Sequence, residues 1–258
     1  MIQQAYRPAS LQEAVDFHET KKALYLAGGT YVNWAASGLD PEAVVLVGDL
    51  LDDAVTSRGE GIEIGAGITL QALKEAPAVP AALRRAAGFI PSRCVRNMAT
   101  LGGNIAANRP DSYLIPALIA LSARVETAER GPLSVEDYIT KREDALITRV
   151  VLPPVAGTCV VERVILSSAA YPTLTLAVRV AEGEAVLAVG CLADRVIRLQ
   201  EVEERIAAGE LETETEVFDA VHGAVDPPAG LKESAAYRRY ITAAKVARAV
   251  AESRKERG

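Results

Sequence analysis

Apolar residues in the first half of the chain recur at both the helix period and the strand period. Ser10 precedes an apolar-periodic stretch and Glu13 follows three residues later, which predicts a capping box at the start of a helix. Short apolar runs that end at glycine or at polar residues predict strands. The strands predicted in this way are 23–27, 44–47, 61–67 and 124–127, and the further helices are 69–74, 80–87 and 114–121.

The second half of the chain begins where an apolar strand stops at two prolines, Pro153 and Pro154. Three strands are predicted beyond this point, followed by three helices. The strands are 158–166, 173–180 and 185–189, and the helices are 199–207, 214–221 and 234–253. We therefore expect an α+β protein with one domain over 1–154, itself split into lobes of about 1–52 and 53–154, and a second domain over 155–258.

Composition narrows the class of protein. The chain has 258 residues, half of them apolar, and a net charge of −6, and it lacks a basic stretch with interleaved aromatic residues, so we expect no nucleic-acid partner. No apolar run reaches the roughly 20 residues that span a bilayer, so no membrane association is expected. Cys94, Cys159 and Cys191 are too far apart for a C-x-x-C site and predict reduced, buried thiols in a cytoplasmic protein.

Two glycine pairs carry the candidate chemistry. Each ends an apolar run: one lies in 27–30 (Ala-Gly-Gly-Thr) and the other in 99–104 (Ala-Thr-Leu-Gly-Gly-Asn). Glycine has no β-carbon to keep a ligand away, so consecutive N–H groups of two such loops are predicted to converge on one diphosphate. A tight turn between strands is the alternative for each pair taken alone.

The sequence contains no recognisable set of catalytic or metal-binding side chains. The sequence shows no nucleophile–base pair, no catalytic carboxylate pair and no cysteine or histidine set with metal-ligand spacing. We therefore predict no catalytic residue and no metal site, and expect that a bound cofactor carries any reaction.

The whole chain resembles the FAD-binding, or medium, subunit of molybdenum-containing hydroxylases, the group that includes xanthine dehydrogenase and aerobic carbon monoxide dehydrogenase. The similarity is greatest to a bacterial purine-catabolism branch that is xanthine dehydrogenase-like. The motifs that carry it are Tyr6-Arg7-Pro8, 26–30 (Leu-Ala-Gly-Gly-Thr), 92–105 with Arg96-Asn97 before the second glycine pair, and Ala236-Tyr237-Arg238-Arg239.

The resemblance implies a two-lobed FAD-binding domain of the vanillyl-alcohol-oxidase type, followed by a domain with a three-stranded antiparallel sheet and a helical bundle. It implies FAD as the cofactor. The positions it assigns to the FAD site are Leu26, Ala27, Gly28, Gly29, Thr30, Tyr31, Val32, Asn33, Ile90, Ala99, Thr100, Gly102, Gly103, Asn104, Asp111, Tyr113 and Ile147.

Two departures from the family pattern concern the flavin. Where relatives have a cofactor-binding aspartate, three residues before Pro116, this chain has Tyr113, with Asp111 two positions earlier. Either side chain is a candidate for the role. In the stretch 163–169 the lysine common in relatives is missing and Arg163 is an imperfect replacement, which is expected to lower the flavin potential.

By resemblance, the chain is an electron-transfer subunit that passes electrons from iron–sulfur centres through FAD to NAD or another acceptor. The implied partners are a molybdopterin-binding large subunit and a small [2Fe-2S] subunit. Two alternatives stay open at this point: a stand-alone FAD oxidoreductase of the same fold, and a scaffold subunit that has lost FAD.

Overall fold

The computed structural model describes residues 2–167, 170–229 and 233–255, which form two compact units. Unit 1 comprises Met1–Val79, Ser92–Ala107 and Ala123–Pro153, and unit 2 comprises Pro80–Pro91, Asn108–Ser122 and Pro154–Gly258. The last boundary falls between the two prolines that stop the apolar strand. The expected domains 1–154 and 155–258 stay a prediction, because compact packing does not test which parts fold independently.

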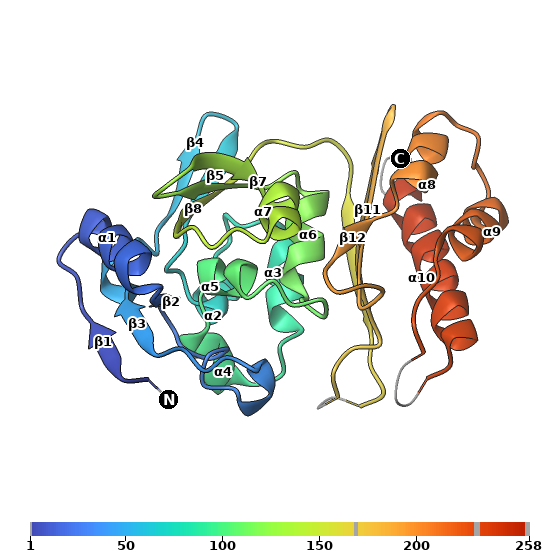
Figure 1. The fold of residues 1–258 in the computed structure, drawn as a ribbon. Helices are drawn as coiled ribbons and strands as arrows, with labels where there is room; N and C mark the ends of the chain where they lie inside the picture. Colours follow the sequence, from blue (N-terminus) through green and yellow to red (C-terminus); the bar gives the residue numbers. More distant parts are fainter. Residues whose placement is uncertain (1, 168–169, 230–232, 256–258) are drawn as a thin grey trace. The chain divides into compact units, whose positions relative to one another are not determined.

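A small parallel sheet in unit 1 ends in the first glycine pair. Its order is β1 (Gln4–Tyr6), β3 (Ala43–Leu46) and β2 (Leu24–Leu26), and α1 (Leu11–Lys21) packs on β3 (Figure 1). Ser10 caps α1 by accepting the Glu13 N–H at 3.2 Å.

The predicted capping box is displaced by one residue. The Glu13 carboxylate accepts the N–H of Ala9 at 2.9 Å, and not that of Ser10. The Tyr6 hydroxyl donates to the same carboxylate oxygen at 3.2 Å, so Glu13 joins the end of β1 to the start of α1.

A larger antiparallel sheet completes unit 1. Its order is β4 (Val55–Arg58), β5 (Gly61–Gly65), β8 (Ile147–Leu152), β6 (Arg124–Thr127) and β7 (Gly131–Ser134). The helices of this unit besides α1 are α2 (Leu70–Glu75), α4 (Arg93–Met98), α5 (Leu101–Ala106) and α7 (Val135–Lys141). Of these elements, β4, β7, α4, α5 and α7 were not predicted from the sequence.

The sheet of unit 2 is antiparallel, with β12 (Ile197–Arg198), β11 (Glu184–Gly190), β10 (Leu174–Ala181) and β9 (Cys159–Val164) in that order. A two-residue turn, Glu182-Gly183, joins β10 to β11, and Gly183 has φ +68°. The sheet thus contains the three predicted strands and one edge strand of two residues that is too short to be recognised in the sequence.

Both faces of this sheet are covered, which explains why all eight residues of β10 are buried. Even-numbered residues such as Leu176 and Val178 join a core with side chains of α8 (Gln200–Ala207), α9 (Glu214–Ala224) and α10 (Ala235–Lys255). These three helices lie together on one side of the sheet (Figure 1). The opposite face is contacted by α3 (Ala81–Gly88) and α6 (Leu114–Ala120). Arg179 points that way and donates to the carbonyl of Ala120.

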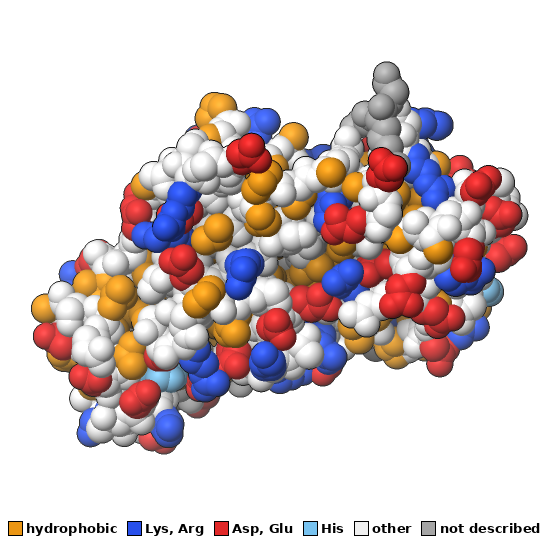
Figure 2. Space-filling view, turned by 90° about the horizontal axis from the view of Figure 1, so that it is seen from above, with side chains coloured by type: hydrophobic (Ala, Val, Ile, Leu, Met, Phe, Trp, Pro, Cys, Tyr) orange, Lys and Arg blue, Asp and Glu red, His pale blue; other side chains and the backbone are white. Residues whose placement is uncertain are grey.

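Charged side chains of both signs are interspersed with uncharged ones on the face drawn in Figure 2. None of the helices in the described part of the chain combines the length and apolar character required to cross a bilayer.

Candidate functional site

The first glycine segment, Leu26–Asn33, leaves the end of β2 and makes a single helical turn. Gly29 has φ +67°, a conformation that favours glycine, and its carbonyl accepts the N–H of Asn33 at 3.0 Å. The chain then enters the short 3₁₀ helix η1 (Ala35–Ser37), with the rings of Tyr31 and Trp34 6.1 Å apart. The segment is therefore an ordered turn at the edge of a parallel sheet.

This turn presents main-chain donors. Within residues 2–167, 170–229 and 233–255, the N–H groups of Gly28, Gly29, Thr30 and Val32 donate no hydrogen bond. All four residues are only half-buried. Buried backbone donors are nearly always paired, so a row of unpaired N–H groups at a partly open surface suits an anion.

Gly28 fixes this turn against the second glycine segment. A β-carbon at Gly28 would lie 1.7 Å from the Met98 carbonyl oxygen and 3.3 Å from the Ala99 nitrogen. Only a residue without a side chain fits there, so unit 1 brings the two predicted segments into direct contact.

The sequence predicted a loop for the second glycine pair, but the structure places it in the first turn of α5. Thr100 is the N-cap, and its hydroxyl accepts the N–H of Gly103 at 3.1 Å. The approach of Gly102 to Ala66 is close, since a β-carbon at Gly102 would lie 2.9 Å from that of Ala66.

The N–H groups of this second segment are already used. Leu101 donates to Ile68 at 3.0 Å and Gly102 to Ala66 at 2.9 Å, which extends an isolated bridge between Thr69 and Thr100. Asn104 donates to the carbonyl of Thr100 at 2.9 Å. The expectation that both glycine pairs offer main-chain hydrogens to one diphosphate is therefore wrong for the second pair, because tertiary hydrogen bonds and a helix cap take them.

The short helix α4 before this segment is almost entirely exposed. Arg96 is its buried residue, and its Nε donates to Gln71 Oε1 on α2 at 2.7 Å. Met98 and Val95 are exposed, with 57% and 40% of their surface open. Arg96 therefore anchors the helix, and Met98, whose carbonyl contacts Gly28, has an exposed apolar side chain.

Unit 2 contains three of the predicted FAD residues, Ile90, Asp111 and Tyr113. Both Asp111 oxygens accept from Arg109, at 2.8 and 2.5 Å, and the two side chains are mostly buried. The Asp111 carboxylate is therefore neutralised by an arginine two residues before it in the chain.

Tyr113 belongs to a second cluster of unit 2. Its ring packs edge-on against Phe89 at 5.7 Å, and the Arg163 guanidinium lies 4.8 Å from the Phe89 centroid and 5.5 Å from that of Tyr113. Arg163 also donates to the Phe89 carbonyl. Burial raises the pKa of Tyr113, while a hydrogen bond from Arg163 acts in the opposite direction, so its hydroxyl stays protonated.

Other predicted features are placed as follows. Ile147 begins β8 and is buried, and its neighbour Leu146 packs in the same apolar cluster as Ala27. The three cysteines are free, but Cys94 is exposed, so the prediction of a buried thiol is wrong there. The cause is that α4 buries only Arg96. Ser168 and Ala169, at the end of the stretch compared with relatives, lie outside the described residues.

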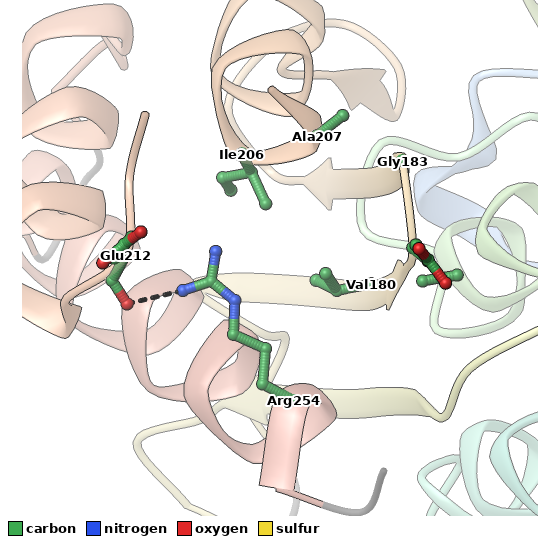
Figure 3. A pocket seen from close by; sticks show the side chains of 8 residues that line it. Val180, Gly183, Ile206, Ala207, Glu212 and Arg254 are labelled. Atoms are coloured by element: carbon green, nitrogen blue, oxygen red, sulfur yellow. Dashed lines mark hydrogen bonds between the residues drawn. The ribbon is translucent and has the colours of Figure 1, made fainter. Parts of the chain in front are cut away.

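A shallow pocket of about 390 Å³ lies elsewhere in unit 2. Val180, Gly183, Ile206 and Arg254 help to line it, and Arg254 donates to the carbonyl of Glu212 (Figure 3). The residues lining it in the described part of the chain include none of those predicted for the cofactor.

The family follows from the sequence match. Residues 1–155 match the family model described as the FAD binding domain in molybdopterin dehydrogenase. The chain belongs to this family. It is therefore an FAD-binding component of the molybdenum hydroxylases, which are oxidoreductases, and FAD is its cofactor.

Alignments with known proteins extend over nearly the whole chain. It is 34% identical over 250 residues to the uncharacterized protein YgfM of Escherichia coli K12, covering 96% of this chain and 95% of that one. It has the fold of a chain of quinoline 2-oxidoreductase from Pseudomonas putida 86, with a TM-score of 0.83, 20% identity and coverage of 99% and 98%. It also has the fold of a chain of carbon monoxide dehydrogenase from Hydrogenophaga pseudoflava, with a TM-score of 0.82 and 22% identity. That match covers 98% of this chain and 97% of the other.

Some residues that build this site were missed in the sequence. Ala66 and Ile68 hold the second segment through their carbonyl groups. A signal was present in Gly65 and Gly67, because β-carbons there would lie 2.1 and 2.7 Å from carbonyl oxygens of the 51–52 stretch. Two glycines around one residue at a strand end indicate such a close approach of backbones.

Proposed function

We propose that the chain is the FAD-holding electron-transfer subunit of a xanthine dehydrogenase-like molybdenum hydroxylase, and that Ala27–Asn33 binds the FAD diphosphate. The observation that carries this proposal is the set of N–H groups at Gly28, Gly29, Thr30 and Val32, which have no acceptor among the described residues. Bound FAD would supply the redox chemistry, since it can accept and release electrons one or two at a time.

The two glycine segments have different roles in this proposal. The first donates N–H groups and the Thr30 hydroxyl to phosphate oxygens, at no cost in side-chain entropy for the main-chain donors. The second supports it from behind, because Gly28 rests on Met98 and Ala99. Gly103 is exposed and Asn104 half-exposed, so we keep both, with Thr100, as cofactor contacts, whereas buried Gly102 serves packing against Ala66.

Tyr113 is the better candidate of the two that replace the family's aspartate. Both oxygens of Asp111 accept from Arg109, whereas the hydroxyl of Tyr113 retains a proton to donate. We therefore assign Tyr113 the polar contact with the cofactor, and Asp111 the task of holding Arg109. Leu26, Tyr31 and Ile90, which are half-buried, would supply apolar surface, whereas Ile147 is buried and would support the site through packing.

The proposed partners are a molybdopterin-binding large subunit and a small [2Fe-2S] subunit, with NAD or another molecule as the electron acceptor. The family, whose members are the FAD binding domain in molybdopterin dehydrogenase, supports these partners. The Hydrogenophaga pseudoflava carbon monoxide dehydrogenase, an enzyme with a molybdenum cofactor, supports them too. In the described part of this chain, no three His, Cys, Asp or Glu side chains are placed to hold a metal ion.

Equilibrium titration with FAD and with riboflavin tests the diphosphate site. Riboflavin has the same ring system but no phosphate, so we expect it to bind at least about a hundredfold more weakly, because two charge-assisted hydrogen bonds are lost. Gly29→Ala places a β-carbon at φ +67° and 3.1 Å from the side-chain Nδ2 of Asn33. The change is expected to weaken FAD binding by about tenfold or more without changing riboflavin binding.

Gly38→Ala is the matched control. Gly38 has φ +70° and no atom within 4 Å of an added β-carbon, so this change introduces the same backbone strain outside the segment. FAD affinity should stay within about twofold of the wild type, a difference of about 0.4 kcal/mol. Equal affinity of the wild type for FAD and riboflavin would contradict the assignment of Ala27–Asn33, and a wild type that binds neither would contradict the FAD-holding role.

A further inference from the structure

Cys191 has a backbone conformation that its position in the fold does not explain. Its φ is +70°, in the left-handed region that is unfavourable for residues other than glycine. Lys22 and Arg142, which share this conformation, end helices α1 and α7, where it is common. Cys191 instead follows strand β11. Strained backbone of this kind persists only where surrounding contacts impose it, and it concentrates at functional sites.

Contacts on three sides hold Cys191 in this conformation. Its N–H donates to the carbonyl of Pro110 at 2.7 Å, and its thiol to the carbonyl of Pro172 at 3.4 Å. Burial raises the pKa of the thiol to about 12, so the sulfur keeps its proton and can donate. Its own carbonyl accepts a hydrogen bond from Arg238.

Gly190 is required for the first of these contacts. A β-carbon at Gly190 would lie 2.6 Å from the Pro110 carbonyl oxygen and 2.3 Å from Thr175 Oγ1. The carbonyl of Pro110 can therefore approach the end of β11 only because residue 190 has no side chain.

Arg238 connects this bend to the last helix. It lies near the start of α10, and its guanidinium donates to the carbonyls of Cys191 and Pro228, the latter at 2.7 Å. A continuous chain of hydrogen bonds thus runs from Arg238 through Cys191 to Pro110. Pro110 lies between Arg109 and Asp111, which form the ion pair described above, and three residues before Tyr113.

We propose that Arg238, with the strained Gly190–Cys191 bend, is a latch that positions residues 109–113 for the cofactor. The inference rests on the proposed function, because it takes Tyr113 as a contact with FAD. Arg238 is a positioning residue here: it acts through Cys191 and Pro110, and α10 supplies the fixed point. The latch also assigns a role to the Tyr237-Arg238-Arg239 motif, whose first side chain is exposed.

Arg238→Gln in the full-length chain tests the latch, with Arg239→Gln as the matched control. Arg239 is the next residue on α10 and donates to the Val225 carbonyl and the Asp226 carboxylate, away from Cys191. For Arg238→Gln we expect FAD affinity to fall by about tenfold, as for one lost charged hydrogen bond, and the visible absorption spectrum of the bound flavin to change. For Arg239→Gln, affinity within about twofold and an unchanged spectrum are expected.

Gly190→Ala supplies the second variant. Its β-carbon would lie 2.6 Å from the Pro110 carbonyl oxygen and force the bend apart, so FAD affinity should fall as in Arg238→Gln, and wild-type affinity would count against the latch. If Arg238→Gln does not fold, Arg238→Lys takes its place, with a smaller loss of affinity because one charged donor is retained.

The outcomes separate the latch from the proposed function. Wild-type affinity and spectrum in the Arg238 variant would overturn the latch alone. An equal loss of FAD affinity in both arginine variants, matched by equal decreases in their thermal unfolding temperatures, would also overturn the latch. Such a result would show that the arginines only stabilise the fold. A wild type that binds no FAD would overturn the proposed function, and the latch with it.

Discussion

Gly28 has no room for a side-chain atom, because a β-carbon there would meet the Met98 carbonyl oxygen at 1.7 Å. Gly28→Ala therefore has to displace backbone, and we expect it to lower the free energy of unfolding by about 1–3 kcal/mol, the usual cost of overpacking. Urea unfolding followed by circular dichroism measures this.

Gly223→Ala provides the comparison for Gly28. Gly223 lies in α9 with no atom within 4 Å of an added β-carbon, so alanine should be neutral or raise stability by up to about 1 kcal/mol through helix propensity. Equal urea midpoints for the two variants would show that the contact between Gly28 and Met98 is not as close as described.

At this scale the sequence indicates which residues are unusual but not why. Gly28, Gly29, Gly102 and Gly103 stand out by their pairing, yet in the part of the chain that the structure describes only the first pair has N–H groups without an acceptor. The difference depends on the carbonyl of Ala66, some thirty-five residues earlier in the chain, which accepts from Gly102, and on the Thr100 hydroxyl, which accepts from Gly103. Sequence spacing carries no information on such tertiary partners.

Strand β10 is the element on which unit 2 depends most, because it is covered on both faces and carries the fully buried Arg179. This guanidinium donates to the carbonyls of Ala120 and Ala156 and to the Glu184 carboxylate. Arg179→Met keeps the volume but leaves these acceptors unpaired, so we expect a loss of roughly 3 kcal/mol in the unfolding of unit 2.

The pH dependence of this loss follows from Glu184. The hydrogen bond from Arg179 lowers the pKa of Glu184, so the stabilisation is present above the pKa of the unfolded chain, about 4.3, and disappears as pH falls through the lower folded value. The difference in stability between wild type and Arg179→Met should therefore be smaller at acid pH than at pH 7. A difference that grows on acidification would contradict the pairing.

Elements with strong periodicity could be predicted from the sequence, and those made by tertiary contacts could not. The strands β9, β10 and β11 and the helices α8, α9 and α10 lie close to their predicted ranges. By contrast, α5 has two glycines in six residues and poor intrinsic propensity. It forms because Thr100 caps it and Ala66 and Ile68 bind its first turn.

For the whole molecule, we expect assembly into a molybdenum hydroxylase. Purified gently from its source, the chain should elute with flavin, molybdenum and iron in one complex, because its family is the FAD-binding component of molybdopterin dehydrogenases. Metal analysis and flavin absorbance across a size-exclusion profile measure this. Elution of the FAD-loaded chain by itself, free of both metals, would contradict the proposed partners.

The most direct test of the diphosphate site is amide hydrogen exchange, resolved by residue, with and without saturating FAD. The N–H groups of Gly28, Gly29, Thr30 and Val32 have no acceptor in the described chain, so they should exchange rapidly until FAD binds and slowly afterwards. Those of Leu101 and Gly102 are bonded to Ile68 and Ala66 and should be protected in both states. Unchanged exchange in the first segment on saturation with FAD would contradict its role in binding the cofactor.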